Sequence, residues 1–524
     1  MKMNKVFAPI SQKINELFGI DLRSLALFRV GLGSLILADL IIRAQDLKAH
    51  YTDLGILPRW AMIQNGSWPE QISLHLISGN VWGQAILFVI AGFLALCLIL
   101  GYQTRWATFL SWVFLISLQS RNLMICYGED VLLRVLTFWS MFLPLGACLS
   151  IDNALRPPQT KFPERVLSMG TVAIFAQIVF VYVFNHLHKS GIEWNEEKNA
   201  VYYALSIDQY ATHIGQWFLN FPSFLKLLSF FVYWFELIGP ILLFSPILTG
   251  PIRTLMVFVF WAMHMGFQVT MELGLFPFVD IVAMTLFLPA WFWERANGIT
   301  SFFQSLLDRV NPFFKSKVLP LFSLYPKPVS LQMSWRTNLL AGFFLVVALF
   351  INLGTFLNFK YKLPEKIQSM SHVLALDQDW SMFSPYPLRD GGWFVIPGKL
   401  KDGTVVDLFS GGKPVTWEKP PLVSSTFKNS RWRQYMMNLW ITNYQQHRLY
   451  YGQYLCRAWN AQHSGDKQLD EFEMYFMLER TPSYYEEANP AVKTIIWKHW
   501  CFEAPKEVNT SSVPEPSPTA TKKL

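Results

Sequence analysis

Long apolar runs alternate with short polar segments along most of this chain. The runs lie at 24–42, 81–100, 104–120, 130–148, 167–187, 225–245, 254–271, 276–293 and 337–356. A helix needs about 20 residues to cross a hydrocarbon core, and these runs approach that length. Because a backbone in lipid has to satisfy its own polar groups, runs of this kind predict helices. The pattern therefore predicts an all-α polytopic membrane bundle of about nine transmembrane helices.

The pattern changes near residue 357 to that of a small α+β extramembrane domain. A hairpin is expected at 392–400 and 404–409, helices at 431–443 and 446–459, and strands at 472–478 and 494–502. The end of the chain is rich in Pro, Ser and Thr and cannot bury enough apolar surface to fold. We therefore expect a cytoplasmic N-terminal segment (1–23), a transmembrane domain (24–356), an extracytoplasmic α+β domain (357–505) and a disordered tail (506–524).

Composition and charge agree with a membrane protein. Of 524 residues, 52% are hydrophobic and only 15% are charged, whereas soluble domains carry roughly 25% charged residues. The net charge of +8 comes from Lys and Arg scattered over short loops, which argues against a nucleic-acid partner. With the N-terminus inside, 15 basic residues fall on inner segments and 7 on outer ones. This bias predicts an inside N-terminus and an outside C-terminal domain. The apolar runs make membrane lipid the expected surrounding partner.

Cysteine spacing gives no sign of a metal site. The five cysteines, Cys97, Cys126, Cys148, Cys456 and Cys501, contain no CxxC pair or other ligand spacing. The last two are the only cysteines of the C-terminal domain. In an exported domain they form a disulfide, since the compartment is oxidising, or they are two buried free cysteines. The sequence leaves both readings open.

Ionisable groups inside apolar runs are costly and each suggests a function. His264, Gln268 and Glu272 are spaced i, i+4 and i+8, which would place them on one helical face. Glu236 lies in another run, and Asp130 and Arg134 stand four residues apart, as an ion pair would. These groups could line one polar cavity. The alternative is that they are a packing histidine and a structural ion pair.

A sharper cluster lies between Asn185 and Trp194. Lys189 follows an apolar run and is surrounded in sequence by His186, His188 and Glu193. In a desolvated pocket, burial disfavours the charged form of a lysine, and a neutral amine is a usable general base. The alternative is a lysine that extends from a helix end to the lipid headgroups.

These residues belong to ordered motifs. Asn122 precedes Tyr-Gly-Glu-Asp at 127–130, and Lys189 is followed five residues later by Trp194. His264 is followed ten residues later by Gly-Leu-Phe at 274–276. Over residues 20–295 this arrangement resembles the horizontally transferred transmembrane (HTTM) domain family, which includes the vitamin K-dependent γ-carboxylases.

The resemblance implies a reaction. In the carboxylases a lysine deprotonates reduced vitamin K, which reacts with oxygen to give a strong base that removes a proton from a peptide glutamate. Carried over, Lys189 and His264 would be catalytic, with Lys189 as general base. A reduced naphthoquinone or other membrane quinol would be the cofactor, with no metal. The residues expected around it are Asn122, His186, His188, Gln268 and Glu272.

Two features depart from the carboxylases. The C-terminal unit is much shorter than their lumenal region, and the motif Trp-Ser-Met-Phe-Ser-Pro-Tyr-Pro at 380–387 looks like bacterial members. We therefore expect a bacterial cytoplasmic membrane. Because a fold does not fix the chemistry, the alternative is a non-enzymatic maturation or binding factor for a secreted peptide or protein. Exterior aromatic residues would anchor it, unless they form the domain's core: Trp432, Tyr435, Trp440, Tyr450, Tyr451, Tyr454 and Trp459.

Overall fold

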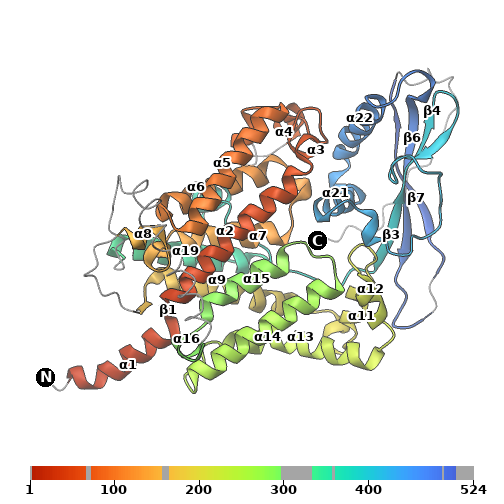
Figure 1. The fold of residues 1–524 in the computed structure, drawn as a ribbon. Helices are drawn as coiled ribbons and strands as arrows, with labels where there is room; N and C mark the ends of the chain where they lie inside the picture. Colours follow the sequence, from red (N-terminus) through yellow and green to blue (C-terminus); the bar gives the residue numbers. More distant parts are fainter. Residues whose placement is uncertain are drawn as a thin grey trace.

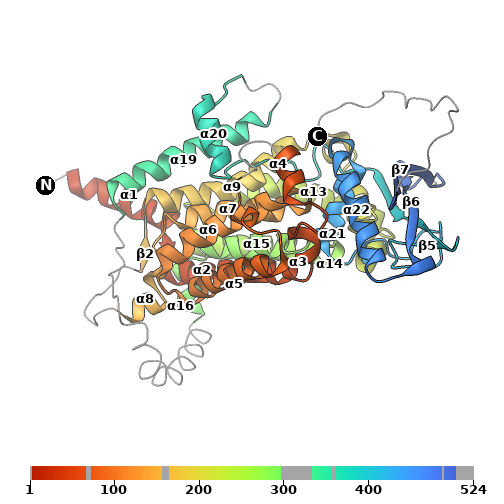
Figure 2. The same ribbon diagram turned by 90° about the horizontal axis from the view of Figure 1, so that it is seen from above.

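The protein is a helix bundle with a small sheet domain at one end, and its structure is a computed structural model (Figure 1). The structure describes residues 3–65, 72–155, 164–296, 333–356, 360–486 and 489–502. The expected tail at 506–524 lies outside these ranges. Figures 1 and 2 show the N-terminal helix α1 (Met3–Phe18) at one end of the bundle and the sheet domain at the other.

Six helices of the described chain are long and apolar enough to cross a membrane. They are α2 (Leu22–Ala44), α5 (Val81–Leu100), α9 (Met169–His188), α13 (Pro222–Leu242), α14 (Thr249–Thr270) and α19 (Trp335–Gly354). Each falls on one of the predicted runs. The protein is therefore a multi-pass membrane protein.

The other three predicted runs also hold helices, but these are shorter or less apolar. They are α6 (Thr104–Arg121), α7 (Gly128–Ser140) and α15 (Phe276–Met284), which continues into the 3-10 turn η4 (Thr285–Phe287). Most residues of α7 are buried inside the protein rather than facing outward. Helix number alone therefore does not give the number of membrane crossings.

Local sequence explains where the long helices begin and end. The Ser168 side chain accepts a hydrogen bond from the Thr171 amide and caps the start of α9. At its other end, Lys189 leaves the helical conformation and turns the chain away. Helix α5 ends at Gly101, whose φ of 68° suits a glycine.

Short elements connect these helices. They are α3 (Leu47–Tyr51), α4 (Arg59–Asn65), η1 (Leu74–Leu76), η2 (Leu123–Ile125), η3 (Leu145–Ala147), α8 (Ile151–Ala154), α10 (Ile192–Asn195), α11 (Ala200–Leu205), α12 (His213–Phe218), α16 (Ala290–Arg295) and α20 (Glu365–Val373). The two-residue strands β1 (Ile20–Asp21) and β2 (Arg165–Val166) pair antiparallel beside the start of α2.

The C-terminal domain has the predicted α+β composition. Its antiparallel strands are β3 (Asp390–Val395), β4 (Pro397–Leu400), β5 (Val405–Asp407), β6 (Leu469–Arg480) and β7 (Val492–Trp500). The long strand β6 pairs with β3 and β4 along one edge and with β7 along the other. Helices α21 (Ser430–Trp440) and α22 (Gln446–Asn460) lie between this sheet and the bundle (Figures 1 and 2).

The exterior aromatic residues form the core of this domain. Tyr435, Tyr450 and Tyr451 are buried, and Trp432, Trp440, Tyr454 and Trp459 pack partly buried against the same cluster. Burial of large rings on one helical face is what an amphipathic helix requires. These side chains are therefore used for packing rather than displayed as anchors for a partner.

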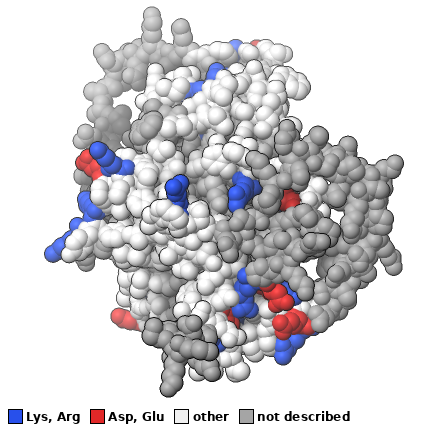
Figure 3. All heavy atoms as spheres, turned by 90° about the vertical axis from the view of Figure 1, so that its left-hand side faces the viewer, with Lys and Arg blue, Asp and Glu red and all other residues white. Residues whose placement is uncertain are grey.

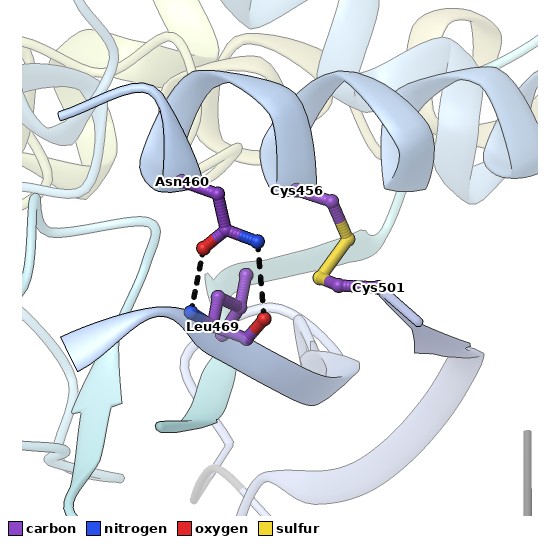
Figure 4. The surroundings of a disulfide bond; sticks show 4 residues. All are labelled: Cys456, Asn460, Leu469 and Cys501. Carbon is purple, nitrogen blue, oxygen red and sulfur yellow. Dashed lines mark hydrogen bonds between the residues drawn. A yellow bond between two sulfur atoms is a disulfide. The ribbon is translucent and has the colours of Figure 1, made fainter. Parts of the chain in front are cut away.

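A disulfide ties α22 to the end of β7. Cys456 and Cys501 are bonded, with their Cα atoms 5.3 Å apart (Figure 4). One turn further along α22, the Asn460 side chain donates to the Leu469 carbonyl (3.2 Å) and accepts from its amide (2.7 Å). Of the two readings that the sequence left open, the structure contains the bridge.

Few of the described side chains at the end of the molecule that carries α1 are charged. Figure 3 views that side and shows Lys and Arg in separate small groups on a mostly uncharged surface, with fewer Asp and Glu side chains. The described part of this face has no continuous basic stripe of the kind that binds nucleic acid.

Candidate functional site

A cavity of about 410 Å³ lies within the helix bundle, near the C-terminal domain. Its walls come from α9, α13, α14 and α15, together with the α10–α11 region and the segment at 382–383. Most lining side chains are apolar, and the polar ones are Tyr182, Asn185, Lys189, Glu236, His264, Thr270 and Asp280. The Thr270 hydroxyl donates to the Gly266 carbonyl of its own helix, and the other polar groups form two clusters.

The first cluster is a buried ion pair between Lys189 and Glu236. Both residues are at most 5% exposed, and Lys189 Nζ donates to Glu236 Oε2. The other carboxylate oxygen accepts from Asn185 Nδ2 at 3.0 Å. The Trp194 ring lies over the amine, with 4.3 Å between Nζ and the ring centroid. Lys189 therefore points into the cavity and not to the lipid headgroups.

The second cluster joins three helices. The Tyr182 hydroxyl lies 2.9 Å from His264 Nε2 and donates to Asp280 Oδ1 at 3.2 Å. His264 Nδ1 and Asp280 Oδ2 are 3.8 Å apart, and neither has a hydrogen-bond partner within the described chain. Buried polar atoms without partners are uncommon, and at a cavity wall they are available to a bound group.

The C-terminal domain closes the cavity next to Lys189. Met382 and Phe383 line it, and the Phe383 carbonyl accepts from Trp194 Nε1 at 2.9 Å. The Gly191 amide donates to the Pro385 carbonyl at 2.9 Å. The motif at 380–387 thus holds the loop that carries Trp194 in place.

A comparison with known protein families matches the HTTM domain over residues 19–292, slightly more than half of the chain. The chain belongs to the HTTM domain family. No curated protein and no solved structure matches it significantly. The two polar clusters both lie inside the HTTM domain, whereas Met382 and Phe383 lie beyond it.

None of the five residues expected around a cofactor lines the described cavity, and three of them make contacts elsewhere in the HTTM domain. The His186 ring lies 2.9 Å from the Tyr233 carbonyl, and the His188 ring lies 2.7 Å from the Thr355 hydroxyl. Asn122 donates to the His50 carbonyl at 3.1 Å. Their side chains serve contacts between elements at other places in the bundle.

The expected shared face of His264, Gln268 and Glu272 is wrong in part. Helix α14 ends at Thr270, and Met271 is extended, so the helical spacing does not continue to Glu272. Glu272 is exposed, and Gln268 is half-buried but does not line the cavity. Of the three residues, only His264 faces the cavity.

The expected ion pair between Asp130 and Arg134 is also wrong. Asp130 Oδ2 accepts from the Tyr127 amide at 2.9 Å and caps the start of α7, which turns its carboxylate away from Arg134. Asp130 then pairs with Arg43 and Arg431, and Arg134 pairs with Asp377 at 2.7 Å. Neither residue lines the cavity.

A buried ionic cluster joins the HTTM domain to α21. Arg431 contacts Asp39 (2.6 Å), Asp130 (2.5 Å) and Glu129, and Arg43 contacts Asp39 (2.8 Å) and Asp130. All five side chains are at most 2% exposed. Burial, together with Asp130 and Asp39, raises the pKa of Glu129 to about 7, although Arg431 opposes the shift.

Sequence reasoning missed Tyr182 and Asp280 and gave Asn185 no role in the site. Asp280 carries the same signal as Glu236, because it is a carboxylate inside the apolar run at 276–293. Tyr182 and Asn185 carry weaker signals, since single Tyr and Asn residues are common at helix contacts in membranes.

Proposed function

We propose that this HTTM protein is a membrane enzyme in which Lys189 acts as general base toward a membrane quinol held in the cavity. The observation that carries the proposal is the buried Lys189–Glu236 pair in a mostly apolar cavity. Perturbed ionisable groups in a cavity are typical of catalytic sites. Its protein substrate would be a secreted peptide or protein that meets the enzyme at the C-terminal domain.

The cavity fits a flat apolar ring with hydroxyl groups. Its volume of about 410 Å³ is within the usual range of small-molecule sites, about 300–1,000 Å³. Apolar side chains such as Val232, Val259 and Phe267 would contact the ring, and Lys189 and His264 would meet polar atoms at its edge. When bound, a quinol supplies an acidic hydroxyl and two reducing electrons.

The ion pair explains how Lys189 becomes able to accept a proton. Transfer of a proton from Nζ to Glu236 Oε2 converts two buried charges into a neutral amine and a neutral acid. Because water is largely excluded, burial favours this neutral form relative to its population in water. Lys189 Nζ then carries a free lone pair, and Asn185 and Trp194 keep the two groups aligned.

Substitution of Lys189 tests the proposal. Membranes containing the wild type or Lys189→Ala, Lys189→Arg or Lys226→Ala are supplied with a reduced naphthoquinone, oxygen and carbonate, and quinone epoxide is measured. We expect epoxide from the wild type and Lys226→Ala, since Lys226 is exposed. Both Lys189 variants should lose about 100-fold or more, as expected for loss of a general base. Full activity of Lys189→Ala, or none in the wild type with any quinol, overturns the proposal.

The alternative of a non-enzymatic binding factor has less support. Its motivating observation was the exterior aromatic side chains, and these pack in the core of the C-terminal domain. Mass spectrometry of the purified protein separates the two functions. A co-purified isoprenoid quinone favours the enzyme, and a stoichiometric peptide favours the binding factor.

We further propose nine membrane crossings, with the N-terminus inside and the C-terminal domain outside a bacterial cytoplasmic membrane. Contacts between Gly191 and Pro385, and between Glu193 and Arg389, support it. These contacts require residues 191–193 and 385–389 to lie on the same side of the membrane. Among the described residues between them, the long helices are α13, α14 and α19, and a crossing by the α15 region makes their number even.

A further inference from the structure

A second cavity, of about 280 Å³, lies between the HTTM domain and α21. It is formed by the start of α7, the turn between α11 and α12, the segment at 381–388, and α21. Leu273, Phe276, Met382 and Phe383 line both this outer cavity and the inner cavity that contains Lys189. The two cavities therefore share a wall.

Arg433 is the one charged side chain among the described residues that line the outer cavity. It is 4% exposed, and no hydrogen-bond or ion-pair partner meets its guanidinium in the described chain; Nε is buried and unpaired. Its Cζ lies 4.5 Å from the centroid of the Tyr210 ring. Two positions earlier, Arg431 meets three carboxylates. The same helix thus buries one arginine fully paired and one unpaired.

A buried charge without a partner is costly and usually serves a ligand. A guanidinium presents its N–H donors as a planar fork that matches a carboxylate with two parallel hydrogen bonds. No carboxylate lines the outer cavity within the described residues, so nothing there competes for Arg433. Tyr210, Ser381 and Tyr386 also line the cavity, and each carries a hydroxyl group that can donate a hydrogen bond.

We propose that the outer cavity is a carboxylate-binding site and that Arg433 binds the carboxylate. A volume of about 280 Å³ suits an acidic side chain or a small organic acid. The site is lined by α21 and the 381–388 segment, on the side of the bundle that meets the C-terminal domain. The place of this carboxylate in a reaction rests on the proposed function, because the shared wall would bring the acid next to Lys189. Binding itself does not require that function.

Ligand-dependent thermal unfolding of the purified full chain in detergent tests the site. The probes are a blocked peptide with one glutamate, the same peptide with glutamine, and glutarate. A ligand that binds only the folded state raises the unfolding midpoint. We expect a concentration-dependent rise with the glutamate peptide, glutarate or both, and none with the glutamine peptide. A larger rise with the peptide identifies a polypeptide as the source, and a larger rise with glutarate identifies a free acid.

Four variants make the test specific. Arg433→Gln and Arg433→Met should lose the ligand-dependent rise, and Arg433→Lys should require at least about tenfold more ligand because it lacks the fork. Arg480→Gln removes an exposed arginine of the same domain and should match the wild type. Arg433→Met should unfold without ligand no earlier than the wild type, since it removes an unpaired buried charge.

Other results overturn the carboxylate site. An equal rise in Arg433→Gln, an equal rise with the glutamine peptide, or no rise in the wild type with either acid would each do so. If Arg433→Met does not fold, Arg433→Lys and Arg433→Gln still show whether Arg433 binds the carboxylate. Lys189→Ala should keep the ligand-dependent rise. Loss of quinol chemistry with retained carboxylate binding therefore separates failure of the proposed function from failure of this inference.

Discussion

At the residue scale, the Lys189–Glu236 pair carries the proposed function and also makes the stability of the protein sensitive to substitution. Removing one partner of a buried pair leaves an uncompensated charge, which costs about 3–5 kcal/mol. We therefore expect Glu236→Ala to lower the free energy of unfolding by about that amount. Replacing both residues, as in Lys189→Met with Glu236→Leu, should recover most of the loss because no charge remains. Unfolding in detergent measures both effects.

Glu272→Ala is the matched control for that experiment, since Glu272 is an exposed carboxylate at the end of α14. It should change stability by less than about 0.5 kcal/mol. A Glu236→Ala protein as stable as this control would show that Lys189 is hydrated and not held in a dry site.

The sequence predicted part of the candidate site at this scale. Ionisable side chains within or next to apolar runs identified Lys189, Glu236 and His264, because burying such groups in a membrane protein is costly. It could not give side-chain direction. His186 and His188 flank the same helix end as Lys189, yet they point to α13 and to the end of α19. Direction depends on how α9 is rotated against its neighbours, which a local pattern does not contain.

At the scale of elements, α21 docks onto the HTTM domain through the buried ionic cluster, which contains more acidic than basic side chains. Among the described residues, Asp39, Glu129 and Asp130 form ion pairs with only Arg43 and Arg431, so uptake of one proton makes the cluster neutral. Glu129, which precedes the apolar part of α7, has its pKa raised from 4.5 to about 7, chiefly by burial. The folded protein therefore binds this proton more tightly than the unfolded chain does.

The raised pKa predicts a pH dependence of stability. Glu129 contributes its full stability below pH 4.5, and the contribution is lost as pH rises through about 7. We expect the thermal midpoint in detergent to fall between about pH 5 and pH 8. Glu129→Gln, which mimics the protonated acid, should remove this part of the fall. An unchanged pH profile in Glu129→Gln would contradict the assignment.

Elements of the fold were more predictable than their contacts. Every predicted apolar run contains a helix, and the turn at 401–403 joins β4 to β5 as expected, with Gly403 at a φ of 84°. The role of Arg431 was not predictable, because an arginine on a polar helix of a small domain is normally solvated. Its partners lie about 300 and 390 residues earlier in the chain.

At the scale of the whole molecule, contacts between distant segments constrain how the chain crosses the membrane. The Thr104 amide at the start of α6 donates to Asp152, which follows α7, at 2.8 Å. At the other end of these helices, Asp130 meets Arg431 of the C-terminal domain. Helices α6 and α7 therefore run the length of the bundle and return. Six helices of the described chain are both long and apolar enough to be candidate spans, because α7 and α15 are short and α6 contains more polar residues.

The last prediction concerns membrane orientation. The proposed nine crossings would put the ends of the chain on opposite sides of the membrane, and the excess of basic residues on inner segments predicts an inside N-terminus. A reporter active only outside the cytoplasm, fused to the C-terminus, should therefore be active, and one fused between α5 and α6 should be inactive. In the oxidising exterior, Cys456 and Cys501 should resist alkylation until a reductant is added. Activity of a cytoplasm-only reporter at the C-terminus, together with free thiols at both positions, would reverse the orientation. The helix bundle and its contacts would be unchanged, but the carboxylate site would then lie on the cytoplasmic side of the membrane.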